Sequence, residues 1–359
     1  MRSRLIDRRS FMRAAGSLFA ASLAPQQLFA LERADAVFAS AYIDEAGRFG
    51  LATITDGGTI VDRSPLPGRA HGLAYDPVFN RIAAFARRPG TFAVIFDRTR
   101  TNAPTIIHSP AGRHFYGHGT FSRDGRLLYA NENDFDNARG VIGIYDATAV
   151  FARIGEYSTF GVGPHDLSVS LDGKVLIAAN GGIETHPDFG RTKLNLDRME
   201  PSLALIDASN GALIEKHALP ANLNQLSTRH IDLADDGSIW FACQFEGPRD
   251  ALPPLIGKFS QGEALRFIDL PDEAARGLAN YVGAIAVNRA EGIVAATSPR
   301  GGTYVVLDGT TGKLIRTVAL KGASGIAAGP HGFGVGTEGG LFAGHQSPLN
   351  WDQHAVRIG

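Results

Sequence analysis

The apolar and polar positions of the chain repeat in short units, each of which starts with a histidine and runs through mostly apolar residues into a turn. Four segments share this pattern, at residues 71–76, 118–125, 165–173 and 230–237. Three of them end in Asp-Gly, a pair typical of tight hairpin turns because glycine adopts a positive φ without strain. Each segment therefore predicts a short β-strand followed by a hairpin.

Further strands follow each turn. The expected second strands are residues 81–86, 127–131, 175–179 and 238–244. Third strands end in aspartate at residues 94–97, 143–146, 204–207 and 305–308, and a fourth strand is clearest at residues 212–219 and 313–320. Four antiparallel strands in each unit are typical of a β-propeller blade.

The spacing of the units predicts seven blades. The first three histidine segments start 47 residues apart, the fourth starts 65 residues after the third because of an insertion, and two further units without histidine start near residues 282 and 324. One unit, at residues 37–66, has only strands two to four, and residues 353–358 match a first strand. We therefore predict an all-β, seven-bladed β-propeller in which the C-terminal strand closes the ring as the innermost strand of blade one. The alternative is that it forms the outer strand of the last blade.

The N-terminus predicts export. Arg8 and Arg9 precede Ser-Phe-Met, and residues 14–30 are uncharged and rich in Ala, Leu and Ser. This arrangement is similar to a twin-arginine signal peptide, and its apolar run is too short to span a bilayer. We expect residues 1–30 to be a cleavable signal peptide and residues 31–359 to be the propeller. The mature protein is then expected in the periplasm without a membrane anchor.

Composition narrows the choice of partners. Without residues 1–30 the chain has 30 basic and 35 acidic residues, a balance that argues against a nucleic-acid partner. Cys243 is the single cysteine and cannot form an intramolecular disulfide. Its apolar neighbours predict a position in the core. We expect a monomer.

Propeller topology brings the histidines of the repeats together. First strands line the central channel, so side chains at the start of each strand gather at one end of it. The histidines concerned are His71, His118, His165, His230 and His354. A ring of neutral imidazoles suits a transition metal, for which copper and iron are the candidates. The alternatives are hydrogen bonding between blades and the binding of an organic ligand.

Polar loops are expected at the same end of the channel. The longest joins a second to a third strand at residues 180–201, and a shorter one occupies residues 131–137. Long loops in a compact domain are more often functional than accidental. The ligand-binding residues expected in and near these loops are Glu132, Glu184, His186, Asp188, Arg191 and Arg229. The alternative is a solvated lid without chemistry.

Two stretches carry a resemblance to a known family. They are Asn180-Gly181-Gly182-Ile183-Glu184-Thr185-His186-Pro187-Asp188 and Trp351-Asp352-Gln353-His354. With the leader and the repeat, they resemble an exported bacterial β-propeller family of unknown function that is often linked with imelysin-type iron-uptake proteins. The resemblance implies a periplasmic location and a link to iron uptake. The histidine strands also look like those of nitrous oxide reductase, whose propeller holds a histidine-bound copper cluster, but the cysteine-bearing copper domain has no counterpart here.

Three functions follow from these expectations. The first is a non-enzymatic periplasmic accessory protein that binds a metal or metal complex at a histidine-lined channel mouth. The second is a propeller enzyme, a lactonase or an oxidoreductase, with Glu132, Glu184 and His186 as acid-base groups and Arg113 and Arg229 nearby. The third is a platform that docks a periplasmic protein partner.

Overall fold

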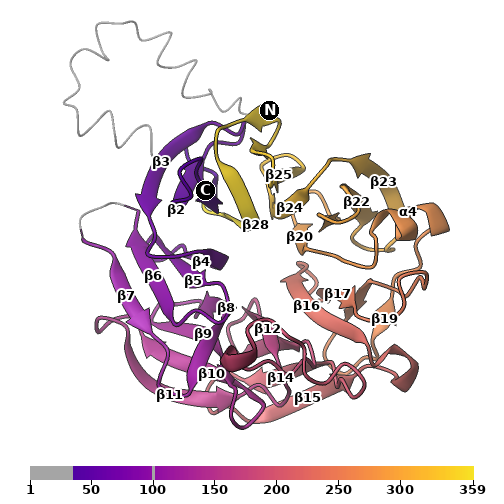
Figure 1. Cartoon of the computed structure of the whole chain (residues 1–359), viewed down its shortest axis with the longest axis horizontal. Coiled ribbons are helices and arrows are strands. Elements are labelled where there is room, and N and C mark those ends of the chain that lie inside the picture. Colours follow the sequence, from indigo (N-terminus) through magenta and orange to yellow (C-terminus); the bar gives the residue numbers. More distant parts are fainter. Residues whose placement is uncertain (1–34, 99–101) are drawn as a thin grey trace, which may run out of the picture.

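The computed structural model describes residues 35–98 and 102–359. The predicted signal peptide at residues 1–30 lies outside the described residues. Seven four-stranded antiparallel sheets surround a central channel, which Figure 1 shows from one end. The sheets are the blades of a β-propeller, so the predicted fold class is confirmed.

In each blade the strands are named in order from the channel outwards. Blade one consists of β28 (Asn350–Arg357), β1 (Phe38–Ile43), β2 (Phe49–Ile54) and β3 (Ile60–Pro65). Blade two consists of β4 (Ala70–Asp76), β5 (Arg81–Ala86), β6 (Phe92–Asp97) and β7 (Thr105–His108). Blade three consists of β8 (Arg113–Phe121), β9 (Leu127–Asp134), β10 (Arg139–Asp146) and β11 (Ala152–Ser158). Blade four consists of β12 (Pro164–Val169), β13 (Val175–Asn180), β14 (Ser202–Asp207) and β15 (Leu213–Ala218).

Blades five to seven complete the ring. Blade five consists of β16 (Leu226–Leu233), β17 (Ile239–Phe245), β18 (Ile256–Phe259) and β19 (Arg266–Phe267). Blade six consists of β20 (Ala284–Asn288), β21 (Ile293–Ser298), β22 (Thr303–Asp308) and β23 (Leu314–Ala319). Blade seven consists of β24 (Ala323–Ala328), β25 (Phe333–Thr337), β26 (Leu341–Phe342) and β27 (His345–Gln346). The helical segments are η1 (Pro187–Phe189), η2 (Ala221–Leu223) and α4 (Asp272–Gly277).

The C-terminal strand closes the ring in the predicted way. β28 pairs antiparallel with β1, with Phe38 opposite Arg357 and Ala39 opposite Val356. In Figure 1 the yellow β28 lies on the channel side of the indigo strands of blade one. The innermost placement is therefore confirmed, and the outer edge of blade seven is formed by β27 instead. Closure covers the edge of β1 that would otherwise face the channel.

Apolar side chains fill the space between neighbouring blades. Phe85 of blade two packs against Phe115 of blade three, with ring centroids 6.1 Å apart. Second strands such as β13 are almost wholly buried. The outer strand β11 instead alternates exposed and half-buried residues, because one of its faces meets solvent. Cys243 is fully buried, which confirms its predicted core position. Within the described residues, no helix combines the length and apolar character needed to cross a membrane.

One predicted loop is shorter than the sequence indicates. The polar run at residues 131–137 was expected to connect two strands, but β9 continues to Asp134 and β10 starts at Arg139. Glu132 is therefore a strand residue, opposite Val141 of β10 and Phe115 of β8. The run is polar because blade three contains a buried ion network, which is described below.

Candidate functional site

The five predicted histidines lie on five different inner strands, and a local irregularity accompanies each of them. The regular register of β4 with β5 breaks between Ala70 and Leu73, on either side of His71. Equivalent breaks occur beside His118 in β8, His165 in β12, His230 in β16 and His354 in β28. A β-bulge bends a strand and re-aims a side chain. Of the two inner strands without a histidine, β20 pairs with β21 without a break, whereas β24 has a break between Ala323 and Ile326, so the breaks are not confined to the histidine strands.

The five imidazoles form one buried cluster on the channel axis. Ring centroids are 4.5 Å apart for His71 and His354, 4.6 Å for His118 and His354, and 4.7 Å for His165 and His230. Each histidine is at most 8% exposed. Two triads have ligand nitrogens that all lie within 4.8 Å of one another, namely His71, His118 and His354, and His118, His165 and His230. His118 belongs to both triads.

Four nitrogens of this cluster are buried without a hydrogen-bond partner among the residues that the structure describes. They are Nδ1 of His71, Nε2 of His118, Nδ1 of His165 and Nε2 of His354. Buried polar atoms in folded proteins nearly always have a partner, because leaving one unpaired costs about 1–3 kcal/mol. Four such atoms in one cluster indicate a site built for something that the protein chain does not itself supply.

The electrostatics of the cluster favour neutral imidazoles. Burial, followed by the neighbouring His354 and His118, holds the pKa of His71 well below its usual value. Burial and Arg229 do the same to the pKa of His165, and burial and His118 to that of His354. Burial and His118 lower the pKa of His230 to about 3. Neutral imidazole is the form that binds metals, since its lone pair is free.

Asp166 orients the cluster from blade four. Its Oδ1 lies 3.2 Å from Nδ1 of His118, and its Oδ2 accepts a hydrogen bond of 3.0 Å from the amide of Ile231 in blade five. Burial acts to raise the pKa of Asp166, but His118 and the Ile231 amide outweigh it, so that the pKa is lowered. A carboxylate on Nδ1 places the proton there and leaves the lone pair on Nε2 of His118, as in the carboxylate–histidine pairs of metal sites.

Two glycines allow the inner strands to approach each other at the cluster. A Cβ on Gly72 would lie 2.6 Å from Nδ1 of His118 and 2.5 Å from the carbonyl oxygen of Gly117. A Cβ on Gly117 would lie 2.7 Å from Cδ2 of His71, and Gly117 also has a φ of +108°. Side chains at either position would separate His71 from His118, so glycine is required for the close packing of these imidazoles.

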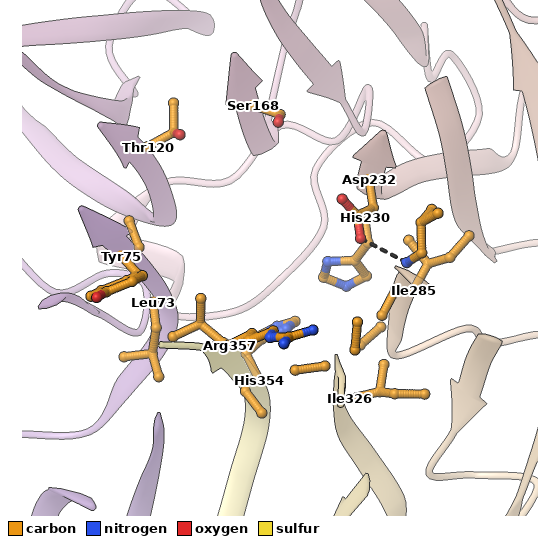
Figure 2. A pocket seen from close by; sticks show the side chains of 18 of the residues that line it. Leu73, Tyr75, Thr120, Ser168, His230, Asp232, Ile285, Ile326, His354 and Arg357 are labelled. Carbon is orange, nitrogen blue, oxygen red and sulfur yellow. Dashed lines mark hydrogen bonds between the residues drawn. The ribbon is translucent and has the colours of Figure 1, made fainter. Parts of the chain in front are cut away.

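Two chambers of the channel meet the histidine cluster from opposite ends. The wide chamber has a volume of about 850 Å³ and is lined by His118, His230 and His354 and by later residues of the inner strands. Figure 2 shows His230 and His354 in this chamber, with Leu73, Ile285 and Ile326 around them. The second chamber, of about 410 Å³, is lined by His71 and His165 and by residues that follow the second strands. Second strands end where first strands begin, so this chamber lies at the other end of the cluster.

We call the second chamber the basic chamber because cationic side chains dominate its lining. They are Arg87, Arg88, Arg191, Lys193, Arg229 and Arg300. Glu338 is the carboxylate among its lining residues, and Tyr116 and Tyr281 add aromatic rings.

Sequence comparison connects the chain with other proteins. A family described as "Protein of unknown function (DUF1513)" matches residues 64–358. The chain belongs to this family. No curated protein matches the sequence of this DUF1513 member. Two of the solved structures that match it are described next. Because each is less than 25% identical to this chain, the likeness extends to the fold and no further.

The two structures come from different organisms. Kuenenia stuttgartiensis hydrazine synthase is 15% identical, with a TM-score of 0.62, and the match covers 80% of this chain and 86% of that one. The β-propeller domain of Myceliophteria thermophila Cps50 (Swd1) is 11% identical, with a TM-score of 0.58, and the match covers 84% and 93%.

The residues predicted to bind a ligand are distributed over three places in this DUF1513 protein. Arg191 and Arg229 line the basic chamber. Glu184 pairs with Arg198 at 3.2 Å, and His186 lies 3.4 Å from Asp136 and 3.6 Å from Asp188, in the loop at residues 180–201. These residues and Glu132 are not in the lining of either chamber.

Glu132 is the centre of a buried ion network in blade three. It is fully buried, and its carboxylate accepts hydrogen bonds from Arg113 at 3.1 Å, Arg153 at 3.0 Å and the Tyr145 hydroxyl at 2.9 Å. This network joins β8, β9, β10 and β11 and leaves the carboxylate no access to a channel ligand. Arg113, expected beside an enzymatic site, takes part in the same network.

Sequence reasoning missed Asp166 and most of the basic chamber. Asp166 directly follows His165, and a carboxylate beside one of the recurring histidines was a usable signal. Arg87 and Arg88 directly follow β5, and Arg300 follows β21, which is the loop position already predicted to face the channel. The expected ligand-binding residues came from the loops at residues 131–137 and 180–201 and from Arg229, and not from the loops after β5 and β21.

Proposed function

We propose that the five-histidine cluster binds a transition-metal ion and that the protein is a periplasmic metal-binding accessory protein. The observation that carries this proposal is the convergence of four buried imidazole nitrogens without partners, on His71, His118, His165 and His354. A metal ion held by the triad of His71, His118 and His354 would give a partner to three of these four imidazoles at once. Direct hydrogen bonds between imidazoles would instead need pairs of donors and acceptors, and none joins two of the five rings in the described structure.

The donor set narrows the choice of metal. Both triads consist of histidines alone, and the nearest carboxylate, Asp166, is engaged with His118. Imidazole donors suit copper, zinc and nickel, whereas non-haem iron sites typically include a carboxylate ligand. The donor set therefore favours copper over iron, although the family resemblance that implies iron uptake supports testing both. The periplasmic location rests on the twin-arginine-like segment around Arg8 and Arg9.

The channel offers routes to the cluster from both ends. The wide chamber reaches His118, His230 and His354, and the basic chamber reaches His71 and His165. A metal ion could therefore enter through one chamber while a second ligand occupies the other. Leu73, Ile285 and Ile326 line the wide chamber around His230 and His354, and apolar side chains beside a metal site lower the local dielectric.

Metal content tests the proposal. The full-length protein is purified, stripped with a chelator and reloaded separately with Cu(II), Zn(II) and Fe(II), and bound metal is measured by elemental analysis. The wild type should bind about one ion per chain, and the variant His118→Ala/His165→Ala, which removes a ligand from both triads, should bind none. The control is His108→Ala, an exposed histidine on the outer strand β7.

A second variant keeps every histidine. Asp166→Asn should weaken metal affinity by about 10- to 100-fold, because the second-shell carboxylate on His118 is lost. Circular dichroism checks that each variant is folded. Uptake of metal by the folded double variant at the wild-type level, or no uptake by the wild type with any of the three ions, would overturn the proposal.

A further inference from the structure

The basic chamber carries an excess of positive charge that the protein neutralises only in part. Six cationic side chains line it, against one carboxylate, Glu338. The chain as a whole is nearly neutral, with a formal net charge of −1, so this concentration is local. The cations come from separate parts of the ring: the β5–β6 connection, the loop at residues 180–201, the inner strand β16 and the β21–β22 connection.

Three of the six cations have no carboxylate within salt-bridge distance in the described part of the chain. They are Arg88, Arg191 and Arg300, whereas Lys193 and Arg229 share Glu246. Arg87 comes only to 4.0 Å from Asp352, and its Nε is buried without a hydrogen-bond partner in the described structure. Guanidinium groups at such positions are available to an anion from solution.

Aromatic rings hold two of these guanidiniums in place. Arg88 lies over the ring of Tyr116 at 5.3 Å, and Arg300 lies over the ring of Tyr281 at 4.8 Å. Cation–π stacking orients a guanidinium without consuming its N–H donors, which point away from its faces. The N–H donors of each guanidinium are thus held in position, so the arginine side chains lose less conformational entropy when a ligand binds.

The crowding of like charges has an energetic consequence in the empty chamber. Burial, followed by Arg87 and Arg88, lowers the pKa of Arg191 to about 10. Bringing these cations together opposes folding, and a bound anion would relieve that repulsion. An anion therefore both fills the chamber and stabilises the fold around it.

We propose that the basic chamber binds a small organic polycarboxylate. A guanidinium fork pairs with a carboxylate through two parallel hydrogen bonds, and the partnerless forks of Arg88, Arg191 and Arg300 stand on three different blades or loops. Because the three guanidinium groups come from separate elements, separate carboxylates of one molecule can pair with separate guanidinium groups. A volume of about 410 Å³ is within the range of small-molecule sites.

This site is distinct from the metal site but adjoins it. His71 and His165 belong to the lining of the basic chamber as well as to the histidine cluster. A polycarboxylate held there has oxygen donors next to the imidazoles. The inference goes beyond the proposed metal binding and does not require it, because the six cations face the chamber whether or not the cluster holds a metal.

Calorimetric titration tests the inference on the metal-free full-length protein. The probes are citrate, which carries three carboxylates, and inorganic phosphate and sulfate as compact anions. We expect saturable binding of citrate at about one molecule per chain, at least about tenfold tighter than phosphate or sulfate, and weakened by salt. Arg191→Gln and Arg300→Gln should each weaken citrate binding by about tenfold or more.

The controls separate this inference from general charge effects and from metal binding. Arg316→Gln on the outer strand β23 removes one exposed cation far from the chamber and should leave citrate affinity unchanged. The variant His118→Ala, which removes the histidine shared by both triads and lies outside the lining of the basic chamber, should still bind citrate, so failure of the metal proposal would not remove this site. Absence of citrate binding, equal binding of citrate and phosphate, or folded Arg191→Gln and Arg300→Gln variants with wild-type affinity would each overturn the inference.

Discussion

Acid should destabilise the metal-free protein through the histidine cluster, and His230 allows the effect to be calculated. Its pKa is about 3 in the folded protein, lowered by burial and by His118, against 6.5 in the absence of these effects. At about pH 7.5 the side chain is neutral in both the folded and the unfolded chain. At lower pH the unfolded chain takes up a proton that the folded chain excludes, so stability is lost as the pH falls from 6.5 towards about 3.

The size of the effect follows from the difference in proton affinity. Each pH unit below the unfolded pKa costs about 1.4 kcal/mol while the folded side chain stays neutral. At about pH 5 His230 alone therefore destabilises the folded state by about 2 kcal/mol relative to about pH 7.5. His71, His165 and His354 act in the same direction, since burial lowers their pKa values too.

Urea unfolding with a chelator present, at about pH 7.5 and about pH 5, measures this loss. In His230→Gln, which cannot take up the proton, the decrease in unfolding free energy between the two pH values should be about 2 kcal/mol smaller than in the wild type. His108→Gln, an exposed substitution on β7, should show the wild-type decrease. Equal decreases in the wild type and His230→Gln would refute the reasoning.

Two further predictions concern packing around the channel and in blade three. Gly72→Ala adds a methyl group 2.5 Å from the Gly117 carbonyl oxygen. It should lower the unfolding free energy by about 1–3 kcal/mol and reduce metal uptake. The control is Gly155→Ala, whose Cβ meets only Ile144 at 3.8 Å, and it should change neither quantity. Wild-type metal uptake by Gly72→Ala would contradict the role given to this glycine. Glu132→Ala removes the buried carboxylate that Arg113, Arg153 and the Tyr145 hydroxyl share, and leaves the two arginines with Glu156. It should lower the unfolding free energy in urea by about 1–3 kcal/mol, against a small change for the control Glu263→Ala, an exposed residue. A loss as small as that of the control would show that the network is not needed for stability.

The sequence was sufficient for the architecture because a repeated blade carries its own periodicity. The 47-residue spacing predicted the number of blades, and the missing first strand of blade one predicted the closing strand. The same periodicity predicted which histidines would meet, since each lies on an inner strand, near the start of β4 and β12 and farther along β8, β16 and β28.

The side-chain contacts between strands, and the paths of the loops, follow no such repeat. Glu132 was placed in a loop because residues 131–137 are polar, but its partners Arg113, Arg153 and Tyr145 come from three other strands and bury it. Arg88, Arg191 and Arg300 converge from loops whose paths depend on the folded ring, so their common chamber could not be read from spacing. The β-bulges that turn the histidines inward are likewise invisible in the alternation of apolar residues.

The seam between β1 and β28 couples completion of the ring to completion of the histidine cluster. Ser40 donates a hydrogen bond of 2.9 Å to the carbonyl oxygen of His354, 314 positions away. Because the same segment supplies both the closing strand and one of the five imidazoles, the triad of His71, His118 and His354 forms only when the ring closes. The full set of five imidazoles on the axis is therefore reached only in the step that makes the ring whole.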